Sequence, residues 1–268
     1  MRRRCLSPDR LHRLMPFLVA IGLMLLPPSV HAAKALWYLG QKVPDVTRPW
    51  QSADYRQATE ALKTIDAKQP DALPRRGGEY TGAVFERLIN EENFRPQLDI
   101  YESLDFRREE ASRILFSLKE IMRLYFDFSA SRQPYGKEAL SLMSYSIRQQ
   151  AVLFDLTVEF WLTLSEKDQQ SPERLEGLND TKVAAAMLAS SALDYLNLHQ
   201  QFDQEALIIY SYELGKTWPE LFVHLPKAER ERLLAKVTQI SEKHDLDEVK
   251  KTLSELLPVL TQIHESIG

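Results

Sequence analysis

Apolar residues recur at helical spacing along most of the chain. In the segment 106–128 they fall on one face of an α-helix, at intervals of four, three and four residues: Ile114, Leu118, Ile121 and Tyr125. The opposite face pairs charges four residues apart, the spacing at which side chains meet along a helix: Glu109 with Arg113, and Arg123 with Asp127. This pattern predicts a helix with one buried and one solvated face.

The next segment, 137–167, is more apolar, and we expect one long helix there. Its inward-facing candidates are Leu140, Met143, Ile147, Val152, Leu156, Phe160 and Leu164. A narrow polar stripe runs beside them and consists of Ser144, Arg148, Asp155 and Glu159. Pro134 suits the first turn of such a helix, where its missing N–H would have no partner in any case.

The stretch SPERLEGLND at 171–180 predicts a break between helices. It combines Pro172 with two capping candidates, Asn179 and Asp180. The residues that follow, 181–199, are rich in alanine and serine, so a neighbouring helix can approach their backbone closely. We therefore expect this segment to be the central helix.

The C-terminal part predicts two antiparallel amphipathic helices, at 226–243 and 245–267. Asp245 or Asp247 is expected to cap the second of them, and Pro258 should kink or divide it. Both segments carry apolar residues at spacings of three and four, which is typical of helices that bury one face.

A shorter buried helix is predicted at 204–216 and should end at Gly215. The strand-like cluster LIIY at 207–210 sits inside this helical periodicity, and no alternating run long enough to build a sheet occurs elsewhere. The predicted fold class is therefore all-α. We expect an irregular bundle of about seven to nine helices with an N-terminal extended arm.

The first 32 residues follow the order of a secretory signal peptide. An arginine-rich start precedes the short apolar run MPFLVAIGLMLL, and PPSVHAA then supplies helix breakers and small residues before an expected cleavage after Ala32. An uncleaved anchor is the alternative, but spanning a bilayer needs roughly 20 apolar residues. Cys5 precedes the apolar run and is not placed to carry a lipid. The mature protein is expected to be periplasmic or secreted.

Loss of this segment changes the charge and the thiol content. Residues 1–32 hold five arginines and one aspartate of the 34 basic and 38 acidic groups, so 29 basic and 37 acidic groups are left, a formal net charge of −8. Such a surface disfavours nucleic acid as a partner. The single cysteine is also lost, so the core has no disulfide available in an oxidising compartment, and a bacterial envelope is favoured over a eukaryotic secretory route.

We expect three parts in the chain. Residues 1–32 form the cleaved signal peptide, 33–78 an irregular arm plus one short helix, and 79–268 the α-helical bundle domain. No later apolar run is both long enough and free enough of charge to predict a stable membrane span after signal cleavage. The oligomeric state cannot be read from these patterns.

A glycine-rich stretch at 73–88, LPRRGGEYTGAVFERL, raises the question of a phosphate site. Gly77 and Gly82 have the spacing of the glycines in a Walker A loop, but Ala83 and Val84 occupy the positions of its Lys and Ser or Thr. We interpret the stretch as a turn into a helix. Arg75 and Arg76, next to that helix, are kept as candidates for binding an anion.

Three carboxylates are weak candidates for catalysis. Asp155 and Glu159 lie one helical turn apart, and mutual repulsion would make one an acid and the other a base if both faced a cleft. The polar stripe around them is also what a solvated seam between helices looks like. Asp194 falls in the most apolar predicted helix and needs a partner if it is buried.

Four histidines follow the predicted cleavage site: His199, His224, His244 and His264. None forms the Glu-x-x-His or His-x-x-x-His pair of helical metal sites. A set of His244 with Asp245 and Asp247 is explained more simply by a helix start, where acidic residues are common. We therefore expect no metal and no cofactor.

The segment ALWYLGQKVPDVTRPW at 35–50 resists a helical interpretation. Two prolines interrupt it, and it carries the aromatic residues Trp37, Tyr38 and Trp50. Either this arm packs across the helices and fills their grooves, or it is an exposed aromatic surface of the kind that marks a contact site. These three aromatic residues are the binding candidates of the arm.

Three classes of function are compatible with these features. An exported, non-enzymatic helical protein that binds another protein in the cell envelope, such as an adaptor, a chaperone-like factor or a toxin-neutralising inhibitor, is favoured because no catalytic motif is visible. An envelope hydrolase with an unrecognised carboxylate site is one alternative. A helical carrier of a small apolar ligand is the other. No motif points to a particular protein family.

Overall fold

The computed structural model describes residues 36–79, 81–127, 135–198 and 202–267. The predicted signal peptide at 1–32 lies outside these residues, as do Cys5, Pro134 and His199. The described part is almost entirely helical, which confirms the predicted all-α bundle. None of the described helices combines the length and the apolarity that crossing a membrane requires.

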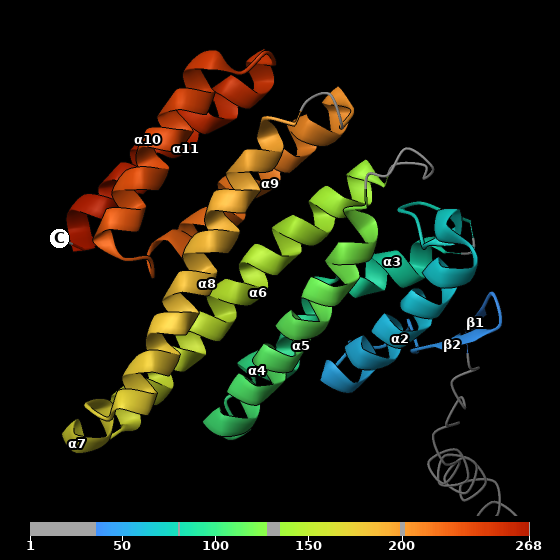
Figure 1. The fold of residues 1–268 in the computed structure, drawn as a ribbon, viewed down its shortest axis with the longest axis horizontal. Coiled ribbons are helices and arrows are strands. Elements are labelled where there is room, and N and C mark those ends of the chain that lie inside the picture. Colours follow the sequence, from blue (N-terminus) through green and yellow to red (C-terminus); the bar gives the residue numbers. More distant parts are fainter. Residues whose placement is uncertain (1–35, 80, 128–134, 199–201, 268) are drawn as a thin grey trace, which may run out of the picture. The chain divides into compact units, whose positions relative to one another are not determined.

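The helices follow the chain in an order that Figure 1 shows. The long ones are α2 (Ser52–Lys68), α5 (Leu104–Tyr125), α6 (Gly136–Thr163), α8 (Pro172–Leu196), α9 (Gln204–Phe222), α10 (Lys227–Lys243) and α11 (Asp247–Ile267). Short helices lie between them: α3 (Gly82–Leu88), α4 (Arg95–Leu98), α7 (Glu166–Gln169) and the 3₁₀ turns Pro70–Ala72 and Glu91–Phe94.

The central helix is α6. It packs against α5 on one side and against α8 and α9 on the other, while α2 lies outside α5 and the hairpin of α10 and α11 lies outside α8 and α9 (Figure 1). The prediction that 181–199 is central was therefore wrong. Small residues do allow close packing of α8, but only its second half, from Ala185 onward, is buried.

Two apolar cores meet at α6. Leu140, Met143 and Ile147 face a core shared with α8, α9, α10 and α11. Ala139, Leu142 and Tyr145 face a second core built with α2, α3 and α5. Burial on two faces explains why this segment is apolar nearly all round, because a helix between two cores has no solvated side along that length.

The face predicted for α5 is confirmed. Ile114, Leu118, Ile121 and Tyr125 are fully buried. On the solvated side Glu109 pairs with Arg113 as expected, whereas Arg123 pairs with Glu120 one turn earlier. Ser103 directly precedes the helix, and its hydroxyl accepts the Phe106 N–H and so caps the first turn.

The predicted break at 171–180 was misplaced. The chain breaks before this stretch, at Leu164–Ser165 and again at Gln170–Ser171, and Pro172 opens α8, where a missing N–H costs nothing. Asn179 and Asp180 lie inside the helix and do not cap it.

The boundary predicted at Gly215 was wrong, and Pro258 does not divide the last helix. The helix α9 passes Gly215 and ends at Phe222. A Cβ at Gly215 would lie 3.5 Å from the methyl group of Thr252, an ordinary van der Waals contact, so this position faces α11 without requiring a glycine. Pro258 lies inside α11, which continues undivided to Ile267.

The hairpin of α10 and α11 turns at His244. The Nε2–H of its buried imidazole donates to the carbonyl of Leu196 at 2.8 Å, and its Nδ1 accepts the Leu246 N–H at 3.1 Å. The ring therefore joins the end of α8 to the turn between α10 and α11. The neighbouring Asp247 begins α11 and lies in its first turn, where a negative charge is favourable.

The arm is more regular than the sequence indicates. Residues Leu36–Tyr38 (β1) and Gln41–Val43 (β2) form a short antiparallel hairpin, with positive φ angles at Leu39 and Gly40 in the turn. A two-residue turn of this kind matches the twist of paired strands. The helix that follows, α2, has 17 residues and is not a short helix.

Candidate docking groove

The carboxylates considered for catalysis are solvent-exposed and face three separate basic side chains. Asp155 lies 3.0 Å from Nε2 of His224, Glu159 lies 3.4 Å from the Arg107 guanidinium, and Asp194 lies 2.6 Å from Nζ of Lys236. Asp194 is therefore not a buried charge. The three partners belong to different elements, so these groups do not converge on one reacting position.

The aromatic residues of the arm divide between surface and core. The Trp37 side chain is 65% exposed on β1, and the Tyr38 hydroxyl donates to the carbonyl of Ala72. Trp50 is fully buried: its indole N–H donates to the Asp45 carbonyl at 2.9 Å, and its ring meets Tyr55 edge-on. Because Trp50 belongs to the core, it is not available to a partner.

Arg75 and Arg76 fasten the glycine-rich turn to neighbouring elements. The Arg75 guanidinium lies over the Tyr135 ring, 4.1 Å from its centroid. The backbone N–H of Arg76 donates to Glu138 at 2.8 Å, and its guanidinium lies 3.6 Å from Glu86. These contacts agree with a structural turn. Among the described residues no group of three or more His, Cys, Asp or Glu is arranged to hold a metal ion.

The end of α6, all of α7 and the first half of α8 form a feature that we call the helical tip, residues 157–184. No side chain from Thr157 to Ala184 is buried. The tip nevertheless carries large apolar residues, and several are strongly exposed: Val158, Leu162, Leu175 and Val183. Leu162 is 74% exposed. Apolar helices that lack a core of their own are unusual in a folded chain, and they mark contact surfaces.

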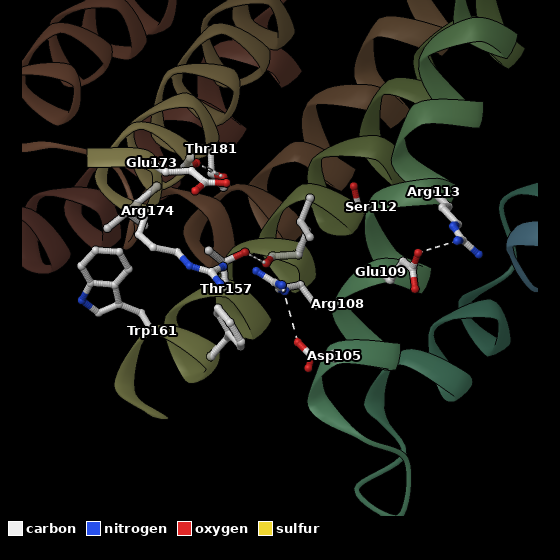
Figure 2. A pocket seen from close by; sticks show the side chains of 14 residues that line it. Asp105, Arg108, Glu109, Ser112, Arg113, Thr157, Trp161, Glu173, Arg174 and Thr181 are labelled. Carbon is white, nitrogen blue, oxygen red and sulfur yellow. Dashed lines mark hydrogen bonds and ion pairs between the residues drawn. The ribbon is translucent and has the colours of Figure 1, made fainter. Parts of the chain in front are cut away.

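A groove of about 670 Å³ lies between the tip and the first turns of α5 (Figure 2). Its α5 wall consists of Asp105, Arg108, Glu109, Ser112 and Arg113. Its α6 wall consists of Leu153, Thr157, Phe160 and Trp161, and its α8 wall of Glu173, Arg174, Gly177, Leu178 and Thr181. The groove is open to solvent, and its lining balances three arginines against three carboxylates.

Two arginines from different helices meet at one ring in this groove. The Arg108 guanidinium lies over the Phe160 ring, 3.9 Å from its centroid, and that of Arg174 lies 5.2 Å from the same centroid. Figure 2 shows the two guanidinium groups pointing toward one another from α5 and α8. Each cation is attracted by the ring, but the two cations repel each other.

A second groove of about 580 Å³ continues on the other side of α5, toward α2. Ser112 and Arg113 line both grooves, which makes the exposed face of α5 the ridge between them. Phe116 lines the second groove and is 68% exposed. A single face of the molecule therefore combines two concave regions with exposed aromatic and aliphatic side chains.

More apolar residues border this face at the turn between α4 and α5. Ile100 and Tyr101 are almost fully exposed there, and Leu98 and Phe106 are partly exposed. The turn directly precedes Asp105 and Arg108, which line the first groove. The exposed apolar surface thus extends from the tip around the mouth of the groove.

The sequence patterns did not identify this groove. Phe160 was predicted to face inward, and Arg108 and Arg174 were part of unremarkable charged stretches. The sequence contains only an indirect signal. The segment 157–184 carries apolar residues on several faces of its helices, and the structure buries none of them. Comparison of the chain with models of known protein families gives no match, and comparisons with curated proteins and with solved structures likewise give none.

Proposed function

We propose that the chain is an exported, non-enzymatic α-helical protein that binds another protein through the helical tip and the groove beside it. The observation that carries the proposal is the tip itself. No side chain from Thr157 to Ala184 is buried, although the segment holds Val158, Leu162 and Leu175 on exposed positions. A partner that covers these residues would supply the apolar contacts that the chain does not make.

Burial of the apolar side chains of the tip against a partner would stabilise the complex. Removing a leucine or valine side chain from water contributes roughly 1.5–3 kcal/mol when burial is complete. Leu162 and Leu175, with the aromatic Trp161 that lines the groove, offer anchors of the size that dominate protein interfaces. The groove supplies the concavity into which a partner side chain can insert.

The hydrolase alternative finds less support. Asp155, Glu159 and Asp194 are exposed and face separate basic side chains, whereas an acid and base pair needs two carboxylates at one cleft. The apolar-carrier alternative needs an enclosed apolar cavity. The groove beside the tip, the groove toward α2 and a third groove at Arg148 and Glu220 are open to solvent and have charged walls.

Site-specific photo-cross-linking tests the proposed surface. A photoreactive amino acid replaces Leu162 on the tip, and the full-length gene is expressed in its native host. The matched control carries the same group at Val259, an exposed apolar residue of α11. We expect a discrete cross-linked protein from position 162 and none from 259. No adduct at 162, or the same adducts at both positions, contradicts the proposal.

Export is tested on the same material. N-terminal sequencing of the purified protein should begin at Ala33, and the protein should be found in the envelope or medium fraction. An intact Met1 on protein that stays in the cytoplasm contradicts export. It leaves the docking surface to be judged by the cross-links alone.

A further inference from the structure

Two positive charges converge at one point of the groove, although the whole lining holds equal numbers of arginines and carboxylates. Arg108 on α5 and Arg174 on α8 both reach the Phe160 ring, and the ring does not neutralise them. Such contacts supply only a weak attraction at an exposed site. Two guanidinium groups that converge from separate helices create a position at which an anion is stabilised by both.

The carboxylates around the groove are unevenly engaged. Glu109 is held by Arg113, and Asp105 lies 3.6 Å from the outer side of Arg108, three residues away on the same helix. Among the described residues no carboxylate lies within 4.0 Å of the Arg174 guanidinium. Arg174 therefore has donors left for an incoming acceptor, and Arg108 uses its donors only in part.

The lining also indicates which anion fits. Three carboxylates, those of Asp105, Glu109 and Glu173, stand around the two converging arginines, so a polyanion such as a nucleic acid or an organic polyphosphate would be repelled. A single carboxylate meets less repulsion and matches the planar, two-pronged guanidinium. Apolar atoms of Leu153, Trp161 and Leu178 line the same groove, so the residues beside that carboxylate should be apolar.

We propose that the groove receives a glutamate or aspartate side chain of a partner protein, flanked by apolar residues, with its carboxylate held between Arg108 and Arg174. This inference rests on the proposed function, because it names the chemistry of the partner segment at the same surface. A bidentate pair between arginine and carboxylate fixes orientation as well as charge. The exposed apolar residues of the tip supply the remaining contact area.

Peptide display tests this without knowing the partner. A random library of 12-residue peptides, a length of about 18 Å when helical, is selected on the purified protein produced from the full-length gene. The same selection is run on the double variant Arg108→Gln/Arg174→Gln. The control is Arg232→Gln, an exposed arginine of α10 whose guanidinium lies 2.8 Å from Glu229. Circular dichroism and thermal melting confirm that all three proteins are folded.

We expect selections on the wild type and on Arg232→Gln to yield peptides with an acidic residue beside apolar ones. Selection on the double variant should lose this acidic preference. Replacing that Glu or Asp by its amide in a selected peptide should weaken binding about tenfold or more. Selected peptides without an acidic preference overturn the anion site but leave the docking surface standing. If no selected peptide binds at the tip, both the anion site and the docking surface are overturned.

Discussion

At the scale of single residues, the N-terminal core depends on a buried polar network. Asn93 is fully buried, and its side-chain oxygen accepts the backbone N–H of Trp50 at 2.8 Å. Its side-chain NH₂ group donates to the Tyr55 hydroxyl and to the backbone carbonyl of Arg87. The Tyr55 hydroxyl also meets that of Tyr145 at 2.9 Å. Every partner comes from a different element, so the network fixes the arm, α2, α6 and the turn after α3 relative to one another.

Replacing Asn93 by Ala should lower the free energy of unfolding by roughly 2–4 kcal/mol. The substitution leaves the buried backbone N–H of Trp50 without a partner, which costs about 1–3 kcal/mol, and it removes one hydrogen bond each from the Tyr55 hydroxyl and the Arg87 carbonyl, which keep other partners. Urea unfolding measures the loss. The control Asn197→Ala changes an exposed asparagine at the end of α8 and should stay within about 0.5 kcal/mol of the wild type. Equal stability of both variants contradicts the role of the network.

Residue-level prediction from sequence worked where periodicity alone decides the outcome. The buried face of α5 follows directly from the spacing of Ile114, Leu118 and Ile121. The groove did not follow, because Arg108, Phe160 and Arg174 meet only after three helices pack. Spacing along one helix carries no information about such a meeting, and Trp50 could not be assigned to the core or the surface for the same reason.

At the scale of elements, α11 tolerates a proline in its interior. Pro258 is exposed, its ring removes one hydrogen bond of the helix, and α11 still runs undivided from Asp247 to Ile267. The opposite face explains this, because Leu253, Leu256 and Leu260 are buried on both sides of the proline. Packing against α9 and α10 holds the helix together across the missing hydrogen bond.

Replacing Pro258 by Ala should stabilise the protein by roughly 1–3 kcal/mol, since a helical hydrogen bond is restored and a steric clash is removed. Thermal melting and urea unfolding measure the gain. Pro172 is the matched control: it stands at the first position of α8, where no N–H is needed, so Pro172→Ala should bring no gain. A loss of stability in Pro258→Ala shows that α11 depends on the proline.

The prolines and glycines of the helices show which element boundaries could be predicted from the sequence. Pro172 was interpreted as a break, and it does stand at a boundary, but as the start of a helix. Gly215 was interpreted as an end, but the helix continues through it, and an added Cβ there would meet Thr252 at an ordinary contact distance. Residue type alone therefore does not decide whether a proline or a glycine starts, ends or lies inside a helix.

At the scale of the whole molecule, both cores bury tyrosine hydroxyls. Burial raises the pKa of Tyr145 to about 12, and it raises the pKa values of Tyr55, Tyr125 and Tyr210 well above the ordinary tyrosine value. The hydroxyls of Tyr125 and Tyr210 donate to backbone carbonyls at 2.8 and 2.9 Å. The folded protein therefore keeps phenolic protons that the unfolded chain releases near pH 10.0.

Stability should fall at alkaline pH as a result. Below about pH 10 both states hold these protons and the contribution is fully present; above it the unfolded chain binds fewer protons than the folded one, so the free energy of unfolding drops as pH rises toward about 12. Each such tyrosine adds a slope of about 1.4 kcal/mol per pH unit. Urea unfolding between about pH 9 and pH 11.5 measures it.

The Tyr145→Phe variant should show a shallower slope than the wild type, because one titrating group is lost. The control Asn197→Ala removes no titrating group and should leave the slope unchanged. A free energy of unfolding that stays constant across this pH range contradicts the burial of the tyrosine hydroxyls.

In the whole molecule, the residues that stabilise the fold are separate from the tip at which we propose that a partner binds. The two cores on either side of α6 hold the fold, and the helical tip at 157–184 extends from them without a core of its own. Local stability follows the density of buried contacts, so the tip should open more readily than the rest of the bundle.

Amide hydrogen exchange of the protein alone tests this most directly. Amides of 172–184 should exchange at least about tenfold faster than those of 185–196, although both belong to the helix α8, because only the second half contributes buried side chains. The end of α6, from Thr157, should exchange faster than its buried first half in the same way. Equal, strong protection along all of α8 contradicts the account, because it would mean that the tip is already covered and is not free to bind a partner.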